Sequence, residues 1–260
     1  MIRTSSAIAL GALFAAASLH QASAADLYGS YGGHAGGLKG SYVAQPQIAA
    51  KPSFYLRLDG IYGEYDKPVM VENGIYDLTG EKIDGSWSLA GGVGYYFTPN
   101  IRGDVTVEKR FATEASGNLS NTASGIAGVR TFDLDSTLVM FNLYYDFDSN
   151  SRVTPYIGAG LGIVHHKTKD GRVDLTYGGT GTIAGESTTD AAGALMAGVS
   201  VALLDQVKLD VGYRFLYMGE TTTGPLTATP TGGSAISSND PTLEDLHAHE
   251  VKFGLRYDFR

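Results

Sequence analysis

Apolar and polar side chains alternate with a period of two in eight separate segments between Pro52 and the end of the chain. This is the period of a β-strand whose two faces meet different surroundings. No stretch beyond residue 24 holds the run of about 18 apolar residues that a membrane-crossing helix needs. If the mature chain crosses a membrane, it must do so as a closed β-barrel, because only helices and closed barrels satisfy every backbone hydrogen bond in lipid.

The connections between these segments differ strongly in length. Short turns at 98–100, 148–151 and 205–206 alternate with long connections at roughly 63–84, 112–133, 167–190 and 219–247. Transmembrane barrels have short periplasmic turns and longer extracellular loops. A lead-in and a C-terminus on the same side require an even strand number, so we expect an eight-stranded antiparallel transmembrane β-barrel with four long extracellular loops.

The second face of each segment separates a membrane barrel from its main alternative, a periplasmic β-protein, because a soluble sandwich also alternates. This face mixes small residues with balanced charges of both signs, which favours internal ion pairing in a barrel just wide enough to be filled by side chains. Glycines 158, 160 and 162 share this inward face and would leave room for a long neighbour such as an arginine. The predicted inward charges are Arg57, Asp59, Arg102, Asp104, Glu108, Arg110, Asp146, Lys208, Asp210, Arg214, Glu250, Lys252, Arg256 and Asp258.

The N-terminus is typical of an exported protein. Arg3 precedes an apolar run at 7–17 and the small triplet 22–24, which predicts a signal peptide over 1–24 with cleavage after Ala24. Residues 25–52, rich in Gly and Tyr, are expected to form a flexible periplasmic lead-in, and residues 53–260 the barrel. Loss of Arg3 leaves a formal charge of 18 − 27 = −9, which argues against nucleic acid as a partner. The chain has no cysteine, so no disulfide stabilises it.

Three runs carry a resemblance to a known family: residues 155–162 (PYIGAGLG), 209–215 (LDVGYRF) and the closing alternation 251–259. With the strands placed, the chain resembles the small outer-membrane β-barrel proteins of the opacity and surface-antigen types in the porin family, similar in plan to the OmpA transmembrane domain. The resemblance covers roughly residue 53 to the end. It implies structural, adhesive or antigenic roles, and recognition of the C-terminal strand by the barrel-insertion machinery. Members usually finish on an aromatic residue, whereas this chain ends Asp258-Phe259-Arg260.

Three chemical motifs were weighed against simpler explanations. A lipid hydrolase needs a His, a Ser and a carboxylate, but neither His165-His166 nor His247-Ala248-His249-Glu250 has an evident nucleophile on its own strand face. His247 and His249 share a face and could ligate a metal, yet only two ligands are visible. The glycines at 178–181 lack the helix and lysine of a phosphate loop and are expected to be loop. We therefore predict no catalytic residue, no cofactor and no metal.

The long connections are expected to carry the external contacts. The first carries Glu64, Asp66, Glu72, Asp77 and Glu81 against Lys67 and Lys82. The last contains four acidic residues, no Lys or Arg, and much Thr, Gly, Pro and Ser, so it should be mobile. The leading hypothesis is a monomeric, non-catalytic protein of the Gram-negative outer membrane, in contact with its lipid and lipopolysaccharide, with an envelope-integrity and surface-contact role. The alternative is a narrow diffusion channel, and pairing of the inward charges would decide between them.

Overall fold

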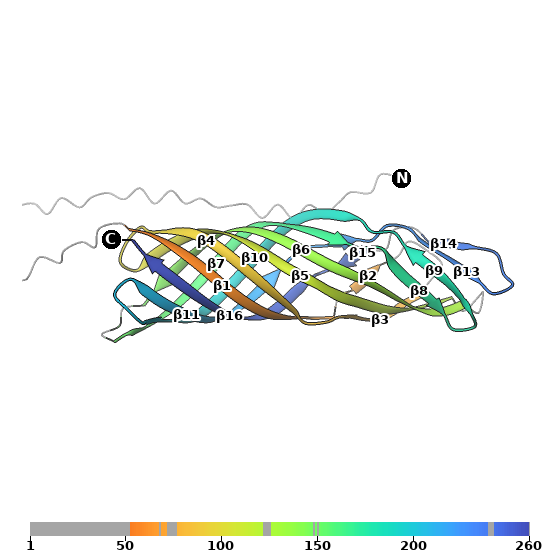
Figure 1. Ribbon diagram of the computed structural model, residues 1–260, viewed down its shortest axis with the longest axis horizontal. Coiled ribbons are helices and arrows are strands. Elements are labelled where there is room, and N and C mark those ends of the chain that lie inside the picture. The colour runs from red at the N-terminus through yellow and green to blue at the C-terminus, as the bar shows by residue number, and fades with distance from the viewer. Residues whose placement is uncertain are drawn as a thin grey trace, which may run out of the picture. The chain divides into compact units, whose positions relative to one another are not determined.

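The computed structural model describes residues 53–67, 69–71, 77–121, 126–147, 149, 151–238 and 242–259 (Figure 1). The predicted signal peptide with cleavage after Ala24, the lead-in at 25–52 and the terminal Arg260 lie outside these residues. In the described ranges no helix is long and apolar enough to span a membrane.

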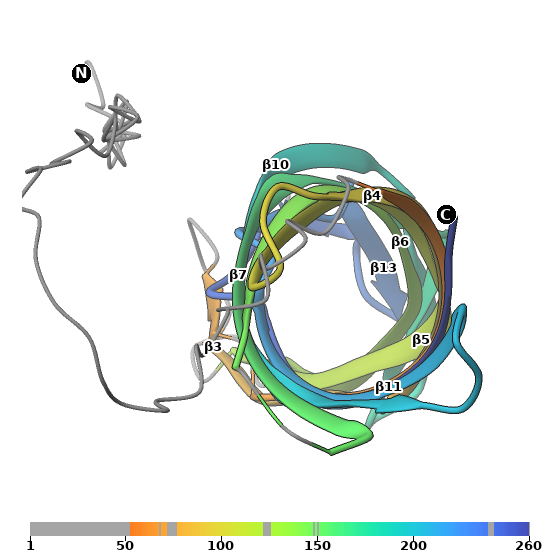
Figure 2. The same cartoon turned by 90° about the vertical axis from the view of Figure 1, so that its left-hand side faces the viewer.

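Eight long antiparallel strands close into a barrel, which Figure 2 shows nearly end-on. Around the ring, each strand pairs with the next in chain order, and β16 pairs with β1 from Tyr55↔Asp258 to Tyr65↔Ala248. The predicted eight-stranded barrel is therefore confirmed. The barrel strands are β1 (Phe54–Tyr65), β4 (Ser86–Tyr96), β5 (Ile101–Asn121), β6 (Ile126–Asp146), β7 (Val153–Thr168), β10 (Ser187–Ala202), β11 (Val207–Tyr217) and β16 (His247–Asp258).

The long connections contain further strands, which corrects two expectations. The glycines at 178–181 were expected to be loop, but Gly179–Ile183 forms a strand that pairs with both neighbours, and the connection at 219–247, expected to be mobile, contains four strands. Backbone pairing among the connections satisfies their hydrogen bonds, which sequence composition alone does not reveal. The short strands are β2 (Val69–Val71), β3 (Asp77–Ile83), β8 (Gly171–Leu175), β9 (Gly179–Ile183), β12 (Thr221–Thr222), β13 (Leu226–Pro230), β14 (Ile236–Ser238) and β15 (Thr242–Glu244).

Two strands are far longer than a bilayer requires. β5 and β6 each have 21 residues, about 70 Å of strand, whereas a tilted strand crosses the hydrocarbon core in about 9–11 residues. Beyond the crossing length their sheet continues through β8, β9, β13 and β14 on one side and β3 on the other. Figure 1 shows β8, β9, β13 and β14 gathered at the end of the barrel opposite to the end where β16 finishes.

We call these two regions the lower barrel and the extension. The lower barrel is the part whose outward side chains form an apolar band, such as Leu58 on β1, Leu143 on β6 and Phe253 on β16, each about half exposed. The extension comprises residues 113–121 and 126–134 of β5 and β6 together with the eight short strands. A bulge between Arg110 and Thr113 on β5 marks the boundary, and across it the inward positions change from even to odd residue numbers.

Candidate functional site: the barrel interior and the extension

The predicted inward charges all lie on the inner face of the lower barrel. Thirteen of the fourteen residues are at most 9% exposed, and the exception is Lys208, whose side chain is 28% exposed near the end with the short turns. The period of two explains this placement, because side chains on alternating positions point to the same face. What the interior can do depends on how these charges pair.

The uppermost cluster joins opposite walls of the barrel. Arg214 on β11 donates to both carboxylate oxygens of Glu108 on β5, at 2.9 and 2.7 Å, and these two strands are four places apart in the ring of eight. Arg110 also donates to Glu108, at 3.2 Å, and both arginines donate to Glu250 on β16. Four buried charges thus form one network that crosses the lumen directly.

A middle cluster is centred on Arg57. Its guanidinium donates to Asp59 at 2.9 Å, to Asp104 at 2.7 Å and to the Tyr144 hydroxyl at 2.8 Å. Asp104 accepts further hydrogen bonds from Asn142, at 2.8 Å, and from the Tyr55 hydroxyl, at 3.0 Å. Each carboxylate here is held by several donors, which offsets part of the free energy lost when a charge is removed from water.

The lowest cluster uses aromatic rings as well as carboxylates. Arg102 donates to Asp146 at 3.0 Å, and its guanidinium carbon lies 4.0 Å from the centre of the Tyr144 ring, a cation–π contact. Arg256 lies 3.4 Å from Asp210, and Lys208 lies 2.8 Å from Asp258. Within the described ranges Lys252 makes no ion pair at hydrogen-bonding distance, although it is buried 5.8 Å from the Tyr144 ring centre.

The inward glycines of β7 make room for a different neighbour from the one expected. A Cβ at Gly158 would lie 2.6 Å from the Tyr144 ring, and one at Gly160 would lie 2.3 Å from the Asn142 side chain. The glycines therefore accommodate a tyrosine and an asparagine directly, and Arg102 packs over that tyrosine from another strand. The alternation along β6 puts Tyr144 on the inward face, and its contacts with the glycines and with Arg102 depend on the neighbouring strands.

The interior of the extension is mainly apolar, and its main charged member is Arg130, which is buried and pairs with Glu81 at 3.1 Å. Its core contains the buried side chains of Leu119 and Phe132, from β5 and β6, and those of Val173, Ile183 and Leu226, from β8, β9 and β13. This cluster continues down to Leu138 and Met140, which lie beside the charged network, because Leu138 is the cross-strand neighbour of Glu108. Sequence analysis missed this core, because its residues are spread over strands of five residues or fewer and over positions whose parity is shifted by the bulge.

The outer face of the extension is polar. On β6, the outward positions change from apolar Phe141 and Val139 to Thr137, Asp135 and Asp133. Ion pairs lie on this surface, including Lys169 with Asp133 at 3.3 Å and Arg172 with Asp174 at 2.9 Å. A further pair, Lys109 with Asp135 at 2.8 Å, lies just below the extension. On β3, the carboxylate of Asp84 raises the pKa of Lys82, because it accepts a hydrogen bond from the charged ammonium group.

The candidate histidines lie in three places. His165 is exposed on the outer face of β7, with its Nδ1 2.9 Å from the Thr189 hydroxyl oxygen. His166 points inward, with its Nδ1 2.7 Å from the Ser136 hydroxyl and its Nε2 3.0 Å from the Met218 carbonyl, and both side chains of this Ser–His pair are buried. His247 and His249 face the Asp66 carboxylate at 2.8 and 3.2 Å on the outer surface. No group of three or more His, Cys, Asp or Glu side chains in the described residues is arranged to hold a metal ion.

Comparison with known proteins gives a family match, two relatives and one similar structure. The sequence matches the family described as outer membrane protein beta-barrel domain over residues 6–259. An uncharacterized protein of Brucella abortus is 27% identical over 220 residues, which cover 76% of this chain and 78% of the relative. A candidate adhesin of Rickettsia bellii is 25% identical over 211 residues, covering 79% and 88% of the two chains. The crystal structure of Neisserial surface protein A overlaps 79% of this chain and 97% of its own, with a TM-score of 0.46 and 20% identity.

Proposed function

We propose that this chain, which belongs to the outer membrane protein beta-barrel family and lies in the outer membrane of Gram-negative bacteria, is a non-catalytic anchor for a folded extracellular platform that makes contacts at the cell surface. The observation that carries the proposal is that the outer face of β5 and β6 changes from apolar to polar along the strands, while their inner face changes from charged to mainly apolar. A connection that only closed the barrel would not need strands about twice as long as the bilayer, or an apolar core of its own.

The platform, which is the extension described above, has the properties of a contact surface. Its outer face is hydrophilic, so it remains soluble above the membrane, and its inner face is packed, so it can present side chains in fixed positions. Tyr177, at the turn between β8 and β9, is 82% exposed, and such exposed aromatic residues are enriched where proteins bind partners. The relative in Rickettsia bellii, described as a candidate adhesin, supports the same class of role.

The charged interior is proposed to serve stability, and it argues against the alternative of a diffusion channel. Ion pairs between opposite walls occupy the space that a water column would need, and the apolar core of the extension lies directly above them. A conducting pore would require unpaired charges around water along the whole axis.

A shortened variant tests the platform. Thr168 and Glu186 are joined by backbone hydrogen bonding at 2.9 Å, so removing residues 170–184 leaves Lys169 and Gly185 as a two-residue turn between paired positions of β7 and β10. Changing Lys169→Asn in the same variant gives Asn-Gly, the preferred sequence for such a hairpin turn. The matched control is the full-length protein carrying Lys169→Asn alone.

Bacteria producing each protein are scored for attachment to cultured epithelial cells, and the purified proteins are recorded in planar bilayers. We expect the control to attach, the shortened variant to attach no better than bacteria without the protein, and neither protein to conduct. The heat-dependent gel shift of a folded barrel must persist in both. Equal attachment by the two proteins would refute the platform, and a steady ionic current through the full-length protein would support the channel instead.

A further inference from the structure

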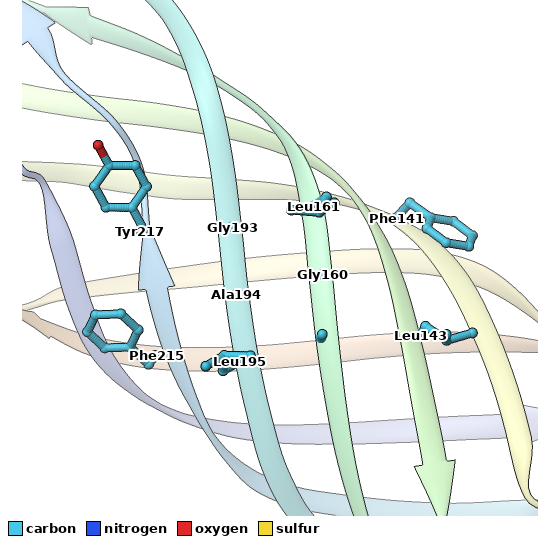
Figure 3. A pocket seen from close by; sticks show the side chains of 10 residues that line it. Phe141, Leu143, Gly160, Leu161, Gly193, Ala194, Leu195, Phe215 and Tyr217 are labelled. Atoms are coloured by element: carbon cyan, nitrogen blue, oxygen red, sulfur yellow. The ribbon is translucent and has the colours of Figure 1, made fainter. Parts of the chain in front are cut away.

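The outer wall of the lower barrel carries an apolar groove of about 510 Å³. Figure 3 shows Phe141 and Leu143 of β6 on one side of it, Phe215 and Tyr217 of β11 on the other, and the ribbons of β7 and β10 between them. The small residues Ala159 and Gly193 form part of its floor, so the outer surface is hollow between the larger side chains of β6 and β11. The groove faces outward, within the apolar band.

Nothing inside the protein requires a glycine at position 193. A Cβ added there would meet only a Leu161 methyl group, at an ordinary 3.9 Å, and its φ angle is not in the left-handed region. The inward Gly160 and Gly162 are different, because a Cβ at either would lie within 2.3 Å of another atom. The missing side chain of Gly193 therefore leaves space on the membrane side rather than room for a neighbour in the barrel.

Polar side chains, one of them a lysine, follow on β7 where its apolar band ends. Ile163 is the last apolar outward residue of β7, and the next two outward residues are His165 and Lys167. The cross-strand neighbour of Lys167 is Asp135, which pairs with Lys109 instead. No ion pair of Lys167 occurs among the described residues, so its charge is available to an external anion.

We propose that this groove binds one hydrocarbon chain of a membrane lipid whose anionic phosphate headgroup rests against Lys167 and His165. The apolar walls match an acyl chain, and His165 and Lys167 stand one and two outward positions above the band, where a lipid headgroup begins. Bilayer hydrocarbon is as apolar as the groove, so the chain is held by van der Waals packing against the walls, and the lysine adds electrostatic attraction to the phosphate.

A second groove on the wall, of about 580 Å³ between Leu56, Val93 and Tyr257, provides the contrast. It lies toward the end with the short turns, and the outward side chains that follow it there, Phe54 and Phe259, are aromatic rather than cationic. Selective occupation of the first groove by an anionic lipid thus depends on the lysine, and not on the hollow alone.

The test uses full-length protein in phosphatidylcholine vesicles that contain a trace of phosphatidylglycerol with a photoactivatable group on one chain. After irradiation, the labelled residues are located by peptide mass spectrometry. Gly193→Phe fills the groove, Gly60→Phe adds the same ring on β1, at an outward glycine with no atom within 4 Å, and Lys167→Ala removes the cation. Photoactivatable phosphatidylcholine measures the headgroup preference, and the gel shift confirms that each variant is folded.

We expect labelling to concentrate on 157–163 and 191–197, to be lost in Gly193→Phe and to persist in Gly60→Phe. Labelling by the anionic lipid should exceed that by the zwitterionic lipid about fivefold, and this preference should disappear in Lys167→Ala. Even labelling of all eight strands, or an unchanged preference without the lysine, would overturn the proposal. Cross-links between two copies of the chain at residue 193 would assign the groove to a dimer contact instead.

Discussion

The lower barrel and the extension are built on the same strands but with opposite polarity. In the lower barrel the outward face is apolar and the interior holds ion pairs such as Arg214 with Glu108. In the extension the outward face carries Asp133 and Asp174, while the interior holds Phe132 and Leu134. The medium outside decides the pattern: lipid requires apolar side chains on the outer wall, and water requires polar ones, so the interior takes whichever class remains.

On β6 the polarity of the two faces reverses without any change in which positions point inward. Even-numbered residues point inward along its described length, yet the inward side chains change from Asn142 to Met140 and the outward ones from Val139 to Thr137 within a few residues. On β5 the same change is accompanied by the bulge after Arg110. The reversal is therefore a property of side-chain choice, and the bulge is only one way to accommodate it.

The largest effect is expected from breaking the charged interior. Arg57→Ala removes the ion-pair partner that Asp59 has among the described residues, and one partner of Asp104. This should lower the free energy of unfolding by about 3–5 kcal/mol, because a buried carboxylate is left unpaired. Urea unfolding in vesicles, followed by the fluorescence of Trp87, measures this change. The control Arg172→Ala breaks an exposed pair in the extension and should cost about 0–1 kcal/mol. Equal midpoints would mean that the interior is hydrated.

Substitution of two phenylalanines on β6, one in each region, tests whether the lower barrel and the extension unfold separately. Phe132→Ala removes a buried ring from the core of the extension and should cost about 3 kcal/mol there, opening β8 and β9 to proteases while the barrel keeps its gel shift. Phe141→Ala removes a ring that faces outward in the apolar band, so protease resistance of the extension should be unchanged. If both variants opened β8 and β9 equally, the two regions would not be separate folding units.

The smallest effect concerns the outer faces. Leu143→Lys places a charge in the apolar band and should reduce stability by about 2 kcal/mol, as measured by the urea midpoint. Thr131→Lys adds the same side chain to the outer face of the extension, where a change within about 0.5 kcal/mol is expected. A stable Leu143→Lys variant would show that this position does not face hydrocarbon.

The sequence predicts the barrel strands well, because two different surroundings impose a strict alternation on segments long enough to display it. The extension escaped prediction for physical reasons. Its strands β8, β9 and β13 have only five residues each, contain glycine or threonine at many positions, and pair with segments distant in sequence. Hydrogen bonding between such segments is a tertiary event, and it overrides the composition that suggests a loop.

The candidate site divides in the same way. The parity of a strand is enough to assign Glu108 and Arg214 to one face, but their contact across the lumen depends on barrel diameter and on strand order, which a local pattern does not contain. The pairing of Ser136 with His166 likewise needed the register of β6 against β7. Tyr144 was recognisable as inward by its position, and only the structure identified it as the ring beneath Arg102.

The pairing of β1 with β16 also determines how the chain reaches its final state. The pairs from Tyr55↔Asp258 to Tyr65↔Ala248 join the two ends of the barrel sequence, so the ring closes only after the last strand has arrived. Contacts this distant in sequence form slowly, and until they form two strand edges stay unpaired. A chain that stopped before residue 247 would lack the twelve residues of β16, so the edges of β1 and β11 would stay uncovered and the ring could not close in lipid.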